Sequence, residues 1–467
     1  MPQNFLPCDR DQELLLPPSM RDWLAEDHFA WFVLDSVERL DLEALYASYR
    51  RDGWGRAAHD PQMMVALLVY AYAIGERSSR AVERRCREDV AFRVIAANQL
   101  PDHATIARFR VRHESALAEL FGQVLGLCAD AGLVSIGVLA VDGSKFAADA
   151  SDAAIRTYEQ IAAEILQEAD DVDAAEDDIH GPTRGDELPA HLAKREGRQA
   201  WLNEAKARLD RERAERADPV SRGRAHRLAV CQRRLVEDWQ AERFANRDYE
   251  VHYARGVLER GRKAMGCGPR PFTPSARPEG KLNTTDPDAK RMKLGRTFIP
   301  AYNAQIVTTA QQIVIAAEIT TDGGDFAQLE PMMAIAEREL RDAGVTEQPA
   351  VVLADAGYWS NGHIDALRQR GMIPIIAPDS SRDKPRKTRL GGPYDFMRRV
   401  LASEQGGALY SQRQWMVEPV FGQIKANRRI DRFKRRGLAA ARSEWRLITA
   451  THNLLKLHRR QLQAIAP

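Results

Sequence analysis

Apolar residues recur every three or four positions from about residue 21 to 133, a spacing that predicts helices. Pro61 stands near one predicted helix start, and the pair Ser78 and Ser79 predicts a break with a new cap. A turn at Pro101 and Asp102 then precedes a long amphipathic helix. The first 133 residues are therefore expected to form a helical domain.

Arginines gather on the second of two short helices in this region, at positions 108, 110 and 112. Short helices, a tight turn and such cations are typical of a helix-turn-helix reader of DNA. A helical packing or oligomerisation domain accounts for the same pattern. His103, beside the turn at Pro101 and Asp102, is expected to serve helix entry rather than catalysis.

The pattern changes at Val134–Phe146, where a short β-branched run ends in Asp-Gly-Ser, as a strand entering a turn does. A highly charged region follows and predicts long helices, including one at about 192–220. After a link rich in Pro and Gly, alternating strands and helices return; the strands are expected at 296–310, 311–322, 348–359 and 372–378. Three strands, a helix and a fourth strand outline a ribonuclease-H-like α/β domain.

The predicted fold class is thus α/β: a ribonuclease-H-like mixed-sheet catalytic domain, interrupted by a charged helical insertion and preceded by an all-α domain. An insertion of that size is tolerated at a surface connection. The expected divisions are a helical domain at 1–133, the catalytic domain at 134–146 and 280–430, the insertion and linker at 147–279, and basic C-terminal helices at 431–467.

Charge is distributed unevenly along the 467 residues, although the net charge is only +2. The range 152–187 carries twelve acids against two arginines, and the range 410–467 carries thirteen Lys and Arg against three acids. Such a basic end suits a polyanion, most simply nucleic acid, and a solvated basic helix face is the alternative.

Several functional classes are disfavoured. Five scattered cysteines without a Cys-x-x-Cys pair argue against a zinc ribbon and a disulfide framework, and favour a reduced cytoplasm. No run of 18 apolar residues predicts a membrane span, and no secretory signal is visible. A phosphate-binding loop is absent, so no nucleotide cofactor is expected.

Two acids stand at predicted strand ends 213 residues apart, Asp142 in "AVDGSKF" and Asp355 in "VVLADAGYW". If the two strands are neighbours, the carboxylates emerge at one edge of the sheet and repel unless a cation lies between them. Oxygen ligands without His or Cys favour Mg²⁺ or Mn²⁺. Ordinary turn chemistry explains either acid alone, since Asp before Gly is common there. Asn303 and Gln305 could point into the same site or pack at the sheet edge.

A third acid is expected from the stretch "YSQRQWMVEPVFGQIK", where Glu418 lies among apolar residues. We expect its helix to be buried around it, so that Glu418 either pairs internally or binds metal. Lys425, seven residues on, is expected on the same helix face. Arg413, Arg428 and Arg429 flank the two and suit a site that grips phosphates.

The motifs "VDGSKF", "GRTFIPAYNAQ", "VVLADAGYWS" and "YSQRQWMVEPVFGQIK", in this order, resemble those of the DDE transposases of bacterial insertion sequences. The stretches "ALLVYAYAIGERSSRAVERRC" and "LPDHATIARFR" resemble the helical domain that precedes the catalytic domain in that group. The resemblance spans most of the chain, and the charged insertion is its least distinctive part.

The resemblance implies that Asp142, Asp355 and Glu418 are the catalytic acids that hold two Mg²⁺ ions, with Mn²⁺ as a substitute. The family signature Tyr-x2-Arg-x3-Glu-x6-Lys is nearly present, with four residues rather than three between Arg413 and Glu418. The extra residue rotates the arginine by about 100° on a helix. Expected DNA contacts are Lys145, Tyr410, Arg413, Lys425, Arg428 and Arg429.

The implied function is cleavage of insertion-element ends and strand transfer into target DNA, without a covalent enzyme intermediate. Double-stranded DNA is the expected partner, and a dimer or larger multimer is expected on DNA because two ends must be brought together. The implied location is the bacterial cytoplasm, in association with the nucleoid. Two alternatives remain open: a nuclease of the same fold that does not join strands, and a DNA-binding domesticated transposase.

Overall fold

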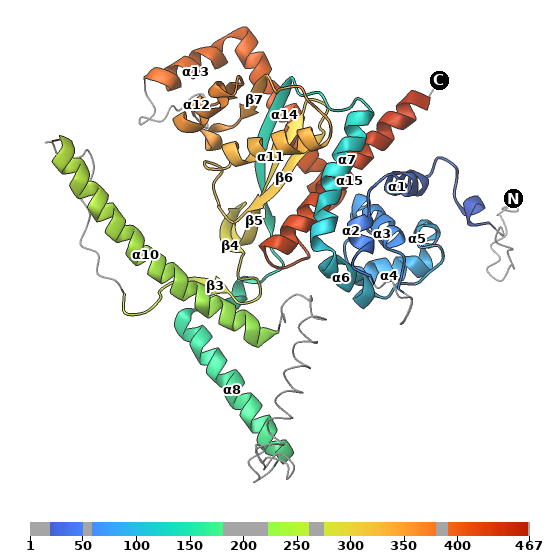
Figure 1. Cartoon of the computed structure of the whole chain (residues 1–467), viewed down its shortest axis with the longest axis horizontal. Helices are drawn as coiled ribbons and strands as arrows, with labels where there is room; N and C mark the ends of the chain where they lie inside the picture. The colour runs from blue at the N-terminus through green and yellow to red at the C-terminus, as the bar shows by residue number, and fades with distance from the viewer. Residues whose placement is uncertain (1–18, 50–57, 181–222, 261–274, 380–390, 466–467) are drawn as a thin grey trace, which may run out of the picture.

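The computed structural model describes residues 19–49, 58–180, 223–260, 275–379 and 391–465. The helix predicted at about 192–220 lies outside these ranges. Within them a mixed sheet is surrounded by helices, and two long helices project away from it (Figure 1). The predicted class, a mixed α/β fold with a helical N-terminal region, is confirmed.

The N-terminal region is helical throughout its described part. After a short 3₁₀ turn, η1 (Met20–Trp23), come α1 (Phe29–Glu38), α2 (Glu43–Tyr46), α3 (Pro61–Ala73), α4 (Ser79–Glu88), α5 (Val90–Ile95), α6 (His103–Arg112) and α7 (Glu114–Asp130). Pro61 opens α3 and the side chain of Ser78 caps α4, as the sequence predicts. The side chain of Asp60 also caps α3. Every residue of α3 except Gln62 is buried, so this helix forms the centre of the N-terminal region.

The main sheet contains six strands: β1 (Val138–Ala147), β4 (Lys290–Leu294), β5 (Thr297–Thr309), β6 (Val314–Thr320), β7 (Val351–Ala354) and β8 (Ile373–Ile376). Their order is β4-β5-β1-β7-β8, with β6 also paired to β5. β5 runs antiparallel to β1, β4 and β6, whereas β7 runs parallel to both β1 and β8. The first strand of the domain is therefore central, between the hairpin strand β5 and the crossover strand β7.

Helices connect and cover the sheet. α11 (Leu329–Asp342) leads from β6 to β7, α12 (Asn361–Gln369) leads from β7 to β8, and α13 (Gly392–Ala402) and α14 (Glu404–Gly422) follow. Alternate residues of β5 belong to different cores, since Tyr302, Ala304 and Ile306 join one hydrophobic cluster and Val307 joins the other. Both faces of the sheet are consequently buried.

The last helix, α15 (Leu438–Ile465), contacts α7, α3 and β6 (Figure 1). Trp445 and Ile448 are fully buried in a cluster that also contains residues of α1, α3, β5 and β6. The N-terminal helices and the sheet therefore share one hydrophobic core with α15. Much of the basic C-terminal sequence thus lies inside the molecule, and α15 is not merely a solvated basic helix.

The charged insertion begins after β1 with a 3₁₀ turn, η2 (Asp152–Ala154), and its described helices are α8 (Tyr158–His180) and α10 (Arg224–Arg260). A small cluster formed by Ile161, Leu228, Cys231 and Leu235 joins the two helices. A short ladder of β2 (Ile155–Thr157) and β3 (Lys281–Asn283) lies at their base (Figure 1).

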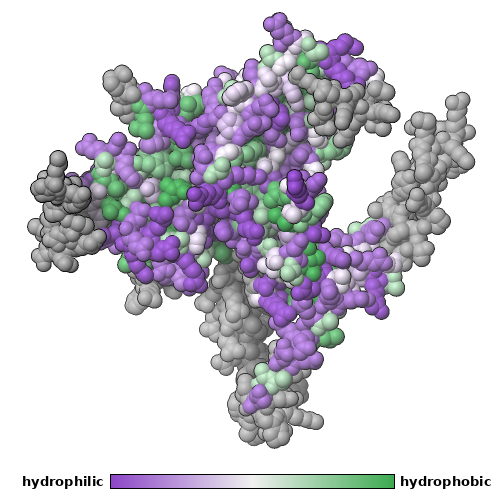
Figure 2. All heavy atoms as spheres, turned by 180° about the vertical axis from the view of Figure 1, so that it is seen from behind, coloured by the Kyte–Doolittle hydropathy of each residue, from purple (hydrophilic) through white to green (hydrophobic). Residues whose placement is uncertain are grey.

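Seen from behind the view of Figure 1, hydrophilic residues cover most of the described surface (Figure 2).

Candidate active site

The parallel ladder between β1 and β7 ends at the pair Ala140 and Leu353. Asp142 and Asp355 each lie two residues beyond this pair, so the two acids lie at the same level along the two strands. Asp355 follows the last residue of β7, as predicted. The prediction that Asp142 ends its strand is wrong: β1 continues to Ala147, because β5 keeps pairing with it on its other edge.

Asp142 is largely buried and paired with an arginine of α14. Its Oδ2 accepts a hydrogen bond from Nη1 of Arg413 at 2.9 Å, and its Oδ1 accepts one from the backbone N–H of Gly143 at 2.8 Å. Burial raises the pKa of Asp142 to about 6; Arg413 opposes the increase, and the charge of Asp355 adds to it. The effect of Asp355 on this pKa reflects the proximity of the two carboxylates.

Asp355 caps the short turn η3 (Ala356–Tyr358) by accepting a hydrogen bond from the backbone N–H of Gly357 at 2.8 Å. The turn directs the fully buried Tyr358 beneath the site, where its hydroxyl donates to Oε1 of Gln305. Burial, followed by the charges of nearby acids, raises the pKa of Tyr358 well above its ordinary value. The phenol therefore stays neutral and acts as a fixed donor under the carboxylates.

Asp325 is a third acid at this edge, and the sequence patterns did not single it out. It lies in the loop between β6 and α11, where its Oδ1 accepts hydrogen bonds from Nδ2 of Asn303 at 2.8 Å and Nε2 of Gln305 at 2.7 Å. The charge of Asp325 contributes to the raised pKa of Asp142. A signal was present, because "TTDGGD" also places acids just after an apolar strand. The amides of Asn303 and Gln305 thus face the site edge, one of the two arrangements expected for them.

Glu418 lies on the exposed side of α14, contrary to the prediction that it is embedded in apolar surroundings. The helix buries Met416, Val417 and Val420, whereas Trp415 is 74% exposed. Within the described ranges Glu418 has no hydrogen-bond or ion-pair partner. An internal salt bridge, the alternative explanation for this acid, is therefore absent from the described part of the chain.

Two family models match the chain. A transposase DDE domain matches residues 273–454, and a transposase domain (DUF772) matches residues 18–112. Together they cover more than half of the sequence, and their order is that of the sheet domain and the N-terminal helices described above. The chain is a DDE transposase. No curated protein and no solved structure matches it.

The transposase is accordingly a DNA-cleaving and DNA-transferring enzyme, and its family generally uses a divalent metal ion. The DDE match includes Asp325, Asp355 and Glu418, whereas Asp142 precedes it, on the other side of the insertion. None of the described helices combines the length and hydropathy that a membrane crossing requires.

The donor set at the sheet edge fits a divalent ion of the magnesium type. No three His, Cys, Asp or Glu side chains of the described residues form a group that could hold an ion alone. Mg²⁺, however, is usually bound by one or two carboxylates together with substrate phosphates and water. Asp142 and Asp355 supply two carboxylates. The pair is therefore suited to an ion whose remaining ligands come with DNA.

Lys425 lies against β1, in the π-helical turn η4 (Gln423–Asn427) that follows α14. Its Nζ donates to Oγ of Ser144 at 2.6 Å and to the backbone oxygen of Lys145 at 2.9 Å, and it lies 4.4 Å from the ring centroid of Phe146. Burial lowers the pKa of Lys425 from its ordinary value. Lys425 contacts β1, whereas Glu418 is exposed, so the two side chains have different surroundings.

Arg428 is an interior residue, so its predicted contact with DNA phosphate is wrong. Its Nη1 donates to the backbone oxygen of Ile448 at 3.1 Å and its Nη2 to Oγ1 of Thr451 at 3.0 Å, both on α15. Burial lowers its pKa to about 9. The neighbouring Arg429 is exposed, and its φ of 55° turns the chain after η4. Consecutive arginines thus point in opposite directions.

The N-terminal arginines are mostly used for packing. Nη1 of Arg110 donates to the backbone oxygen of Arg77 at 2.8 Å, and Arg112 bonds to the backbone oxygen of Ser48. Arg108 remains exposed. His103 opens α6 and contacts Glu83 through Nδ1 at 2.7 Å, which agrees with its expected role in helix entry.

Proposed function

We propose that Asp142, Asp355 and Glu418 are the three catalytic acids of this transposase and that they hold two Mg²⁺ ions, for which Mn²⁺ can substitute. The observation that carries the proposal is the shared position of Asp142 and Asp355, two residues beyond the last pair of the β1/β7 ladder. Two such ions would supply an activated water or hydroxyl and would stabilise the leaving oxygen.

The reaction proceeds in two displacements at phosphorus. In the first, a water oxygen attacks the phosphodiester at an element end and the P–O3′ bond breaks, which leaves a 3′-hydroxyl and a 5′-phosphate. In the second, this 3′-oxygen attacks a phosphodiester of target DNA, and the P–O3′ bond there breaks in turn. Neither step needs a side-chain nucleophile, so the acids only position and neutralise groups.

Within this scheme Arg413 opposes protonation of Asp142 before DNA arrives, because its guanidinium favours the carboxylate form. The ammonium of Lys425 is bonded to Ser144, which lies two residues from Asp142 on β1, and is proposed to meet a phosphate at the same edge. Lys145, Tyr410 and Arg429 are further proposed DNA contacts.

Glu418 would complete the ligand set of the second ion. Its side chain is exposed and has no partner in the described ranges, so no internal bond must break before it binds an ion. This differs from Asp142, which must exchange part of its contact with Arg413 for the ion. The synapsis of two DNA ends further requires at least a dimer on DNA.

Alanine replacements at positions 142, 355 and 418 test the assignment. Each single variant should lose Mg²⁺-dependent cleavage of a duplex that carries an element end, while its affinity for that duplex measured without divalent ions stays close to that of the unaltered protein. Asp342→Ala, which removes an exposed acid at the end of α11, is the matched control. Retained cleavage in one of the three variants would remove that residue from the set.

Soaking crystals with Mn²⁺ gives an independent readout. Anomalous scattering should locate manganese between Asp142 and Asp355 when a DNA end is bound. Strand transfer is tested in solution by adding supercoiled target DNA to the protein bound to an element end. Joined products would support both displacements. Cleavage without joining would contradict the second displacement.

A further inference from the structure

A row of exposed cations lies beyond the catalytic edge, where the chain runs from η4 toward α15. The segment "DRFKRRG" (431–437) joins the far end of β1: the N–H of Ala147 donates to the oxygen of Asp431 at 3.1 Å, and the N–H of Phe433 donates to the oxygen of Ala147 at 2.8 Å. The segment therefore forms one isolated parallel bridge to β1, on the edge that β7 has left.

Side chains of this segment alternate between the interior and solvent. Phe433 and Arg435 are buried, whereas Arg432, Lys434 and Arg436 are exposed. We call these three exposed residues the cationic ladder. The chain bends at Lys434 and Arg435, so the ladder presents three positive charges from neighbouring positions of one short segment.

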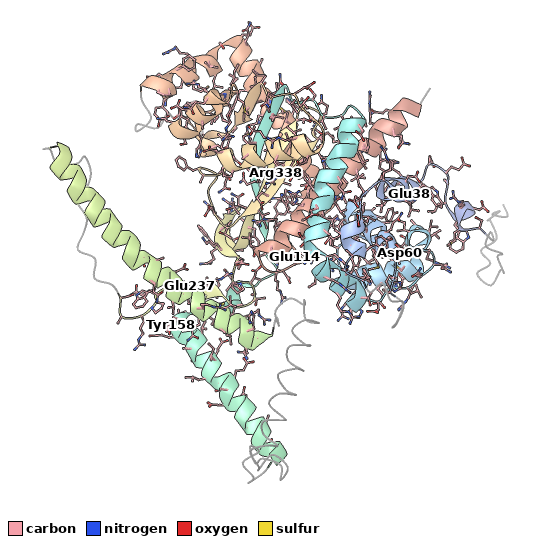
Figure 3. All side chains as sticks on the ribbon, in the orientation of Figure 1. Glu38, Asp60, Glu114, Tyr158, Glu237 and Arg338 are labelled. Atoms are coloured by element: carbon pink, nitrogen blue, oxygen red, sulfur yellow. The ribbon has the colours of Figure 1, made fainter. Side chains whose placement is uncertain are left out.

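Buried contacts fix the backbone of the ladder. Glu444, which is 1% exposed, accepts hydrogen bonds from the backbone N–H groups of Lys434 and Arg435 at 2.9 and 3.0 Å, and it pairs with Arg77 at 2.7 Å. The guanidinium of Arg435 bonds to Glu114 of α7, labelled in Figure 3. Because these anchors order the segment in advance, little conformational entropy remains to be lost when a ligand binds.

The ladder borders two adjacent cavities, which we together call the groove. Two cavities of about 550 and 610 Å³ share Asp149, Thr285 and Arg436 in their walls. The first extends toward Ala147 at the end of β1. The second lies between α6, α10 and the ladder, near the base of the insertion helices whose residues Tyr158 and Glu237 are labelled in Figure 3.

The walls of the second cavity carry a strong positive charge. Six Lys and Arg residues line it against two acids; the basic residues are Arg110, Arg227, Arg234, Lys434, Arg435 and Arg436. Both acids are already paired, Asp149 with Arg436 and Asp288 with Arg234. The surplus of cations suits the phosphate backbone of nucleic acid, which binds such surfaces without regard to sequence.

We propose that this groove and the cationic ladder bind the phosphate backbone of the DNA duplex that extends from the catalytic edge. Arg432 lies beside Ala147, five residues along β1 from Asp142, which corresponds to about 17 Å or about five base pairs of duplex. The distance of about five base pairs from the cleaved phosphate rests on the proposed catalytic role of Asp142. The proposed binding of DNA by the groove does not depend on that role.

The test measures how the affinity for a mixed-sequence DNA duplex depends on salt, without divalent ions so that no cleavage occurs. The triple variant Arg432→Gln/Lys434→Gln/Arg436→Gln should lower the slope of log K against log salt by about 1.8 to 2.7. Each phosphate contact contributes about 0.9, and Arg436 contributes in full only if it exchanges Asp149 for a phosphate. The charge-preserving triple Arg432→Lys/Lys434→Arg/Arg436→Lys should keep the slope of the unaltered protein. The lower slope of the glutamine variant is then due to the lost charges and not to misfolding.

The matched control replaces three exposed arginines of α11 and α12, Arg338→Gln/Arg341→Gln/Arg368→Gln, and should leave the slope unchanged. An unchanged slope in the ladder variant, or an equal decrease in the control, would overturn the proposal. A ladder variant that keeps a normal slope but no longer self-associates without DNA would also overturn it. The groove would then bind the acidic helix α8 of a second copy instead of DNA.

Phosphate-ethylation interference on a duplex carrying an element end locates the contact. Ethylation about five base pairs from the cleaved phosphate should weaken binding by the unaltered protein and not by the ladder variant. The two proposals fail separately: a reduced slope together with cleavage retained in Asp142→Ala would leave the groove in place and remove the catalytic assignment.

Discussion

Arg413 and Asp142 form an ion pair across the catalytic edge, with Nη1 of the arginine 2.9 Å from Oδ2 of the acid. The side chains are 16% and 20% exposed, so the pair is shielded from solvent on most sides. Burial favours the protonated acid and Arg413 favours the ionised one, and the balance leaves the pKa of Asp142 at about 6. The pKa of Asp142 therefore lies closer to neutral pH than the ordinary aspartate value of 3.8.

Replacement of Arg413 by Gln should raise the pKa of Asp142 further, because the largest opposing interaction is lost. Metal-dependent cleavage needs the ionised acid, so the acidic limb of the pH–rate profile should move to higher pH by about one unit or more. Arg413→Lys keeps the charge and should hold the limb closer to its original place. An acidic limb at the same pH in all three proteins would contradict this role of Arg413.

Asp142→Asn should change how stability depends on pH. The folded pKa of Asp142, about 6, exceeds the ordinary value of 3.8, so the folded protein binds more protons than the unfolded chain between these values. The free energy of unfolding of the unaltered protein should then decline between about pH 4 and 6 relative to Asp142→Asn, by on the order of 1–3 kcal/mol.

Thermal melting of both proteins across this pH window, without divalent ions, gives the difference directly. The curves should converge at about pH 4, where Asp142 is mostly protonated, and the variant should be the more stable above pH 6. A constant difference across the window would mean that Asp142 ionises at an ordinary pKa.

The strands of this fold are readable from the sequence because each carries a run of β-branched or apolar residues. Val351–Ala354 and Ile373–Ile376 were both expected, and burial on both faces of the sheet explains why they are continuously apolar. β4 was missed, since Lys290–Leu294 is mostly charged and exposed and forms a strand only because β5 is long enough to pair with it.

The sequence predicts the site residues whose placement depends on the order of the strands. It does not predict those whose side-chain direction depends on the orientation of a helix. Asp142 and Asp355 follow from strand order. The directions of Glu418, Lys425 and Arg428 depend on how α14 is rotated and on the π turn after it, which shifts the phase of every later side chain. The regular spacing of an α-helix does not account for a π turn. Arg428 was therefore expected on the surface, although it is buried.

Asp325 should act mainly by holding two buried amides in place. Asn303 and Gln305 are 1% and 0% exposed, and both donate to the same oxygen of Asp325. Asp325→Ala removes that acceptor and should cost about 1–3 kcal/mol of stability for the buried donors left unpaired. Asp325→Asn keeps an acceptor oxygen and should retain most of the stability.

The effect of the Asp325 charge on Asp142 can be measured separately from the effect of Asp325 on stability. Because that charge raises the pKa of Asp142, Asp325→Asn should move the acidic limb of the pH–rate profile to lower pH. Asp322→Ala, at an exposed position three residues earlier in the same loop, is the matched control and should change neither stability nor the limb. Equal destabilisation by Asp325→Ala and Asp325→Asn would show that the amides do not depend on this acceptor.

Gly143 should be intolerant of a side chain, because the network beneath the acids occupies the space. A Cβ built at this position would lie 2.1 Å from Nε2 of Gln305 and 2.7 Å from Oδ1 of Asp325. Gln305 has little freedom to retreat, since Tyr358 donates to its other amide atom. Gly143→Ala should therefore destabilise the protein by about 1–3 kcal/mol through overpacking and should also impair cleavage, as it displaces groups beside Asp142.

Gly137→Ala is the matched control, because no atom lies within 4 Å of a Cβ built there and the position directly precedes β1. Its melting temperature and cleavage rate should remain close to those of the unaltered protein. If Gly143→Ala melted like Gly137→Ala and cleaved DNA at the normal rate, Gln305 and Asp325 could move apart without consequence. The groups beside Asp142 would then not require a rigid amide network.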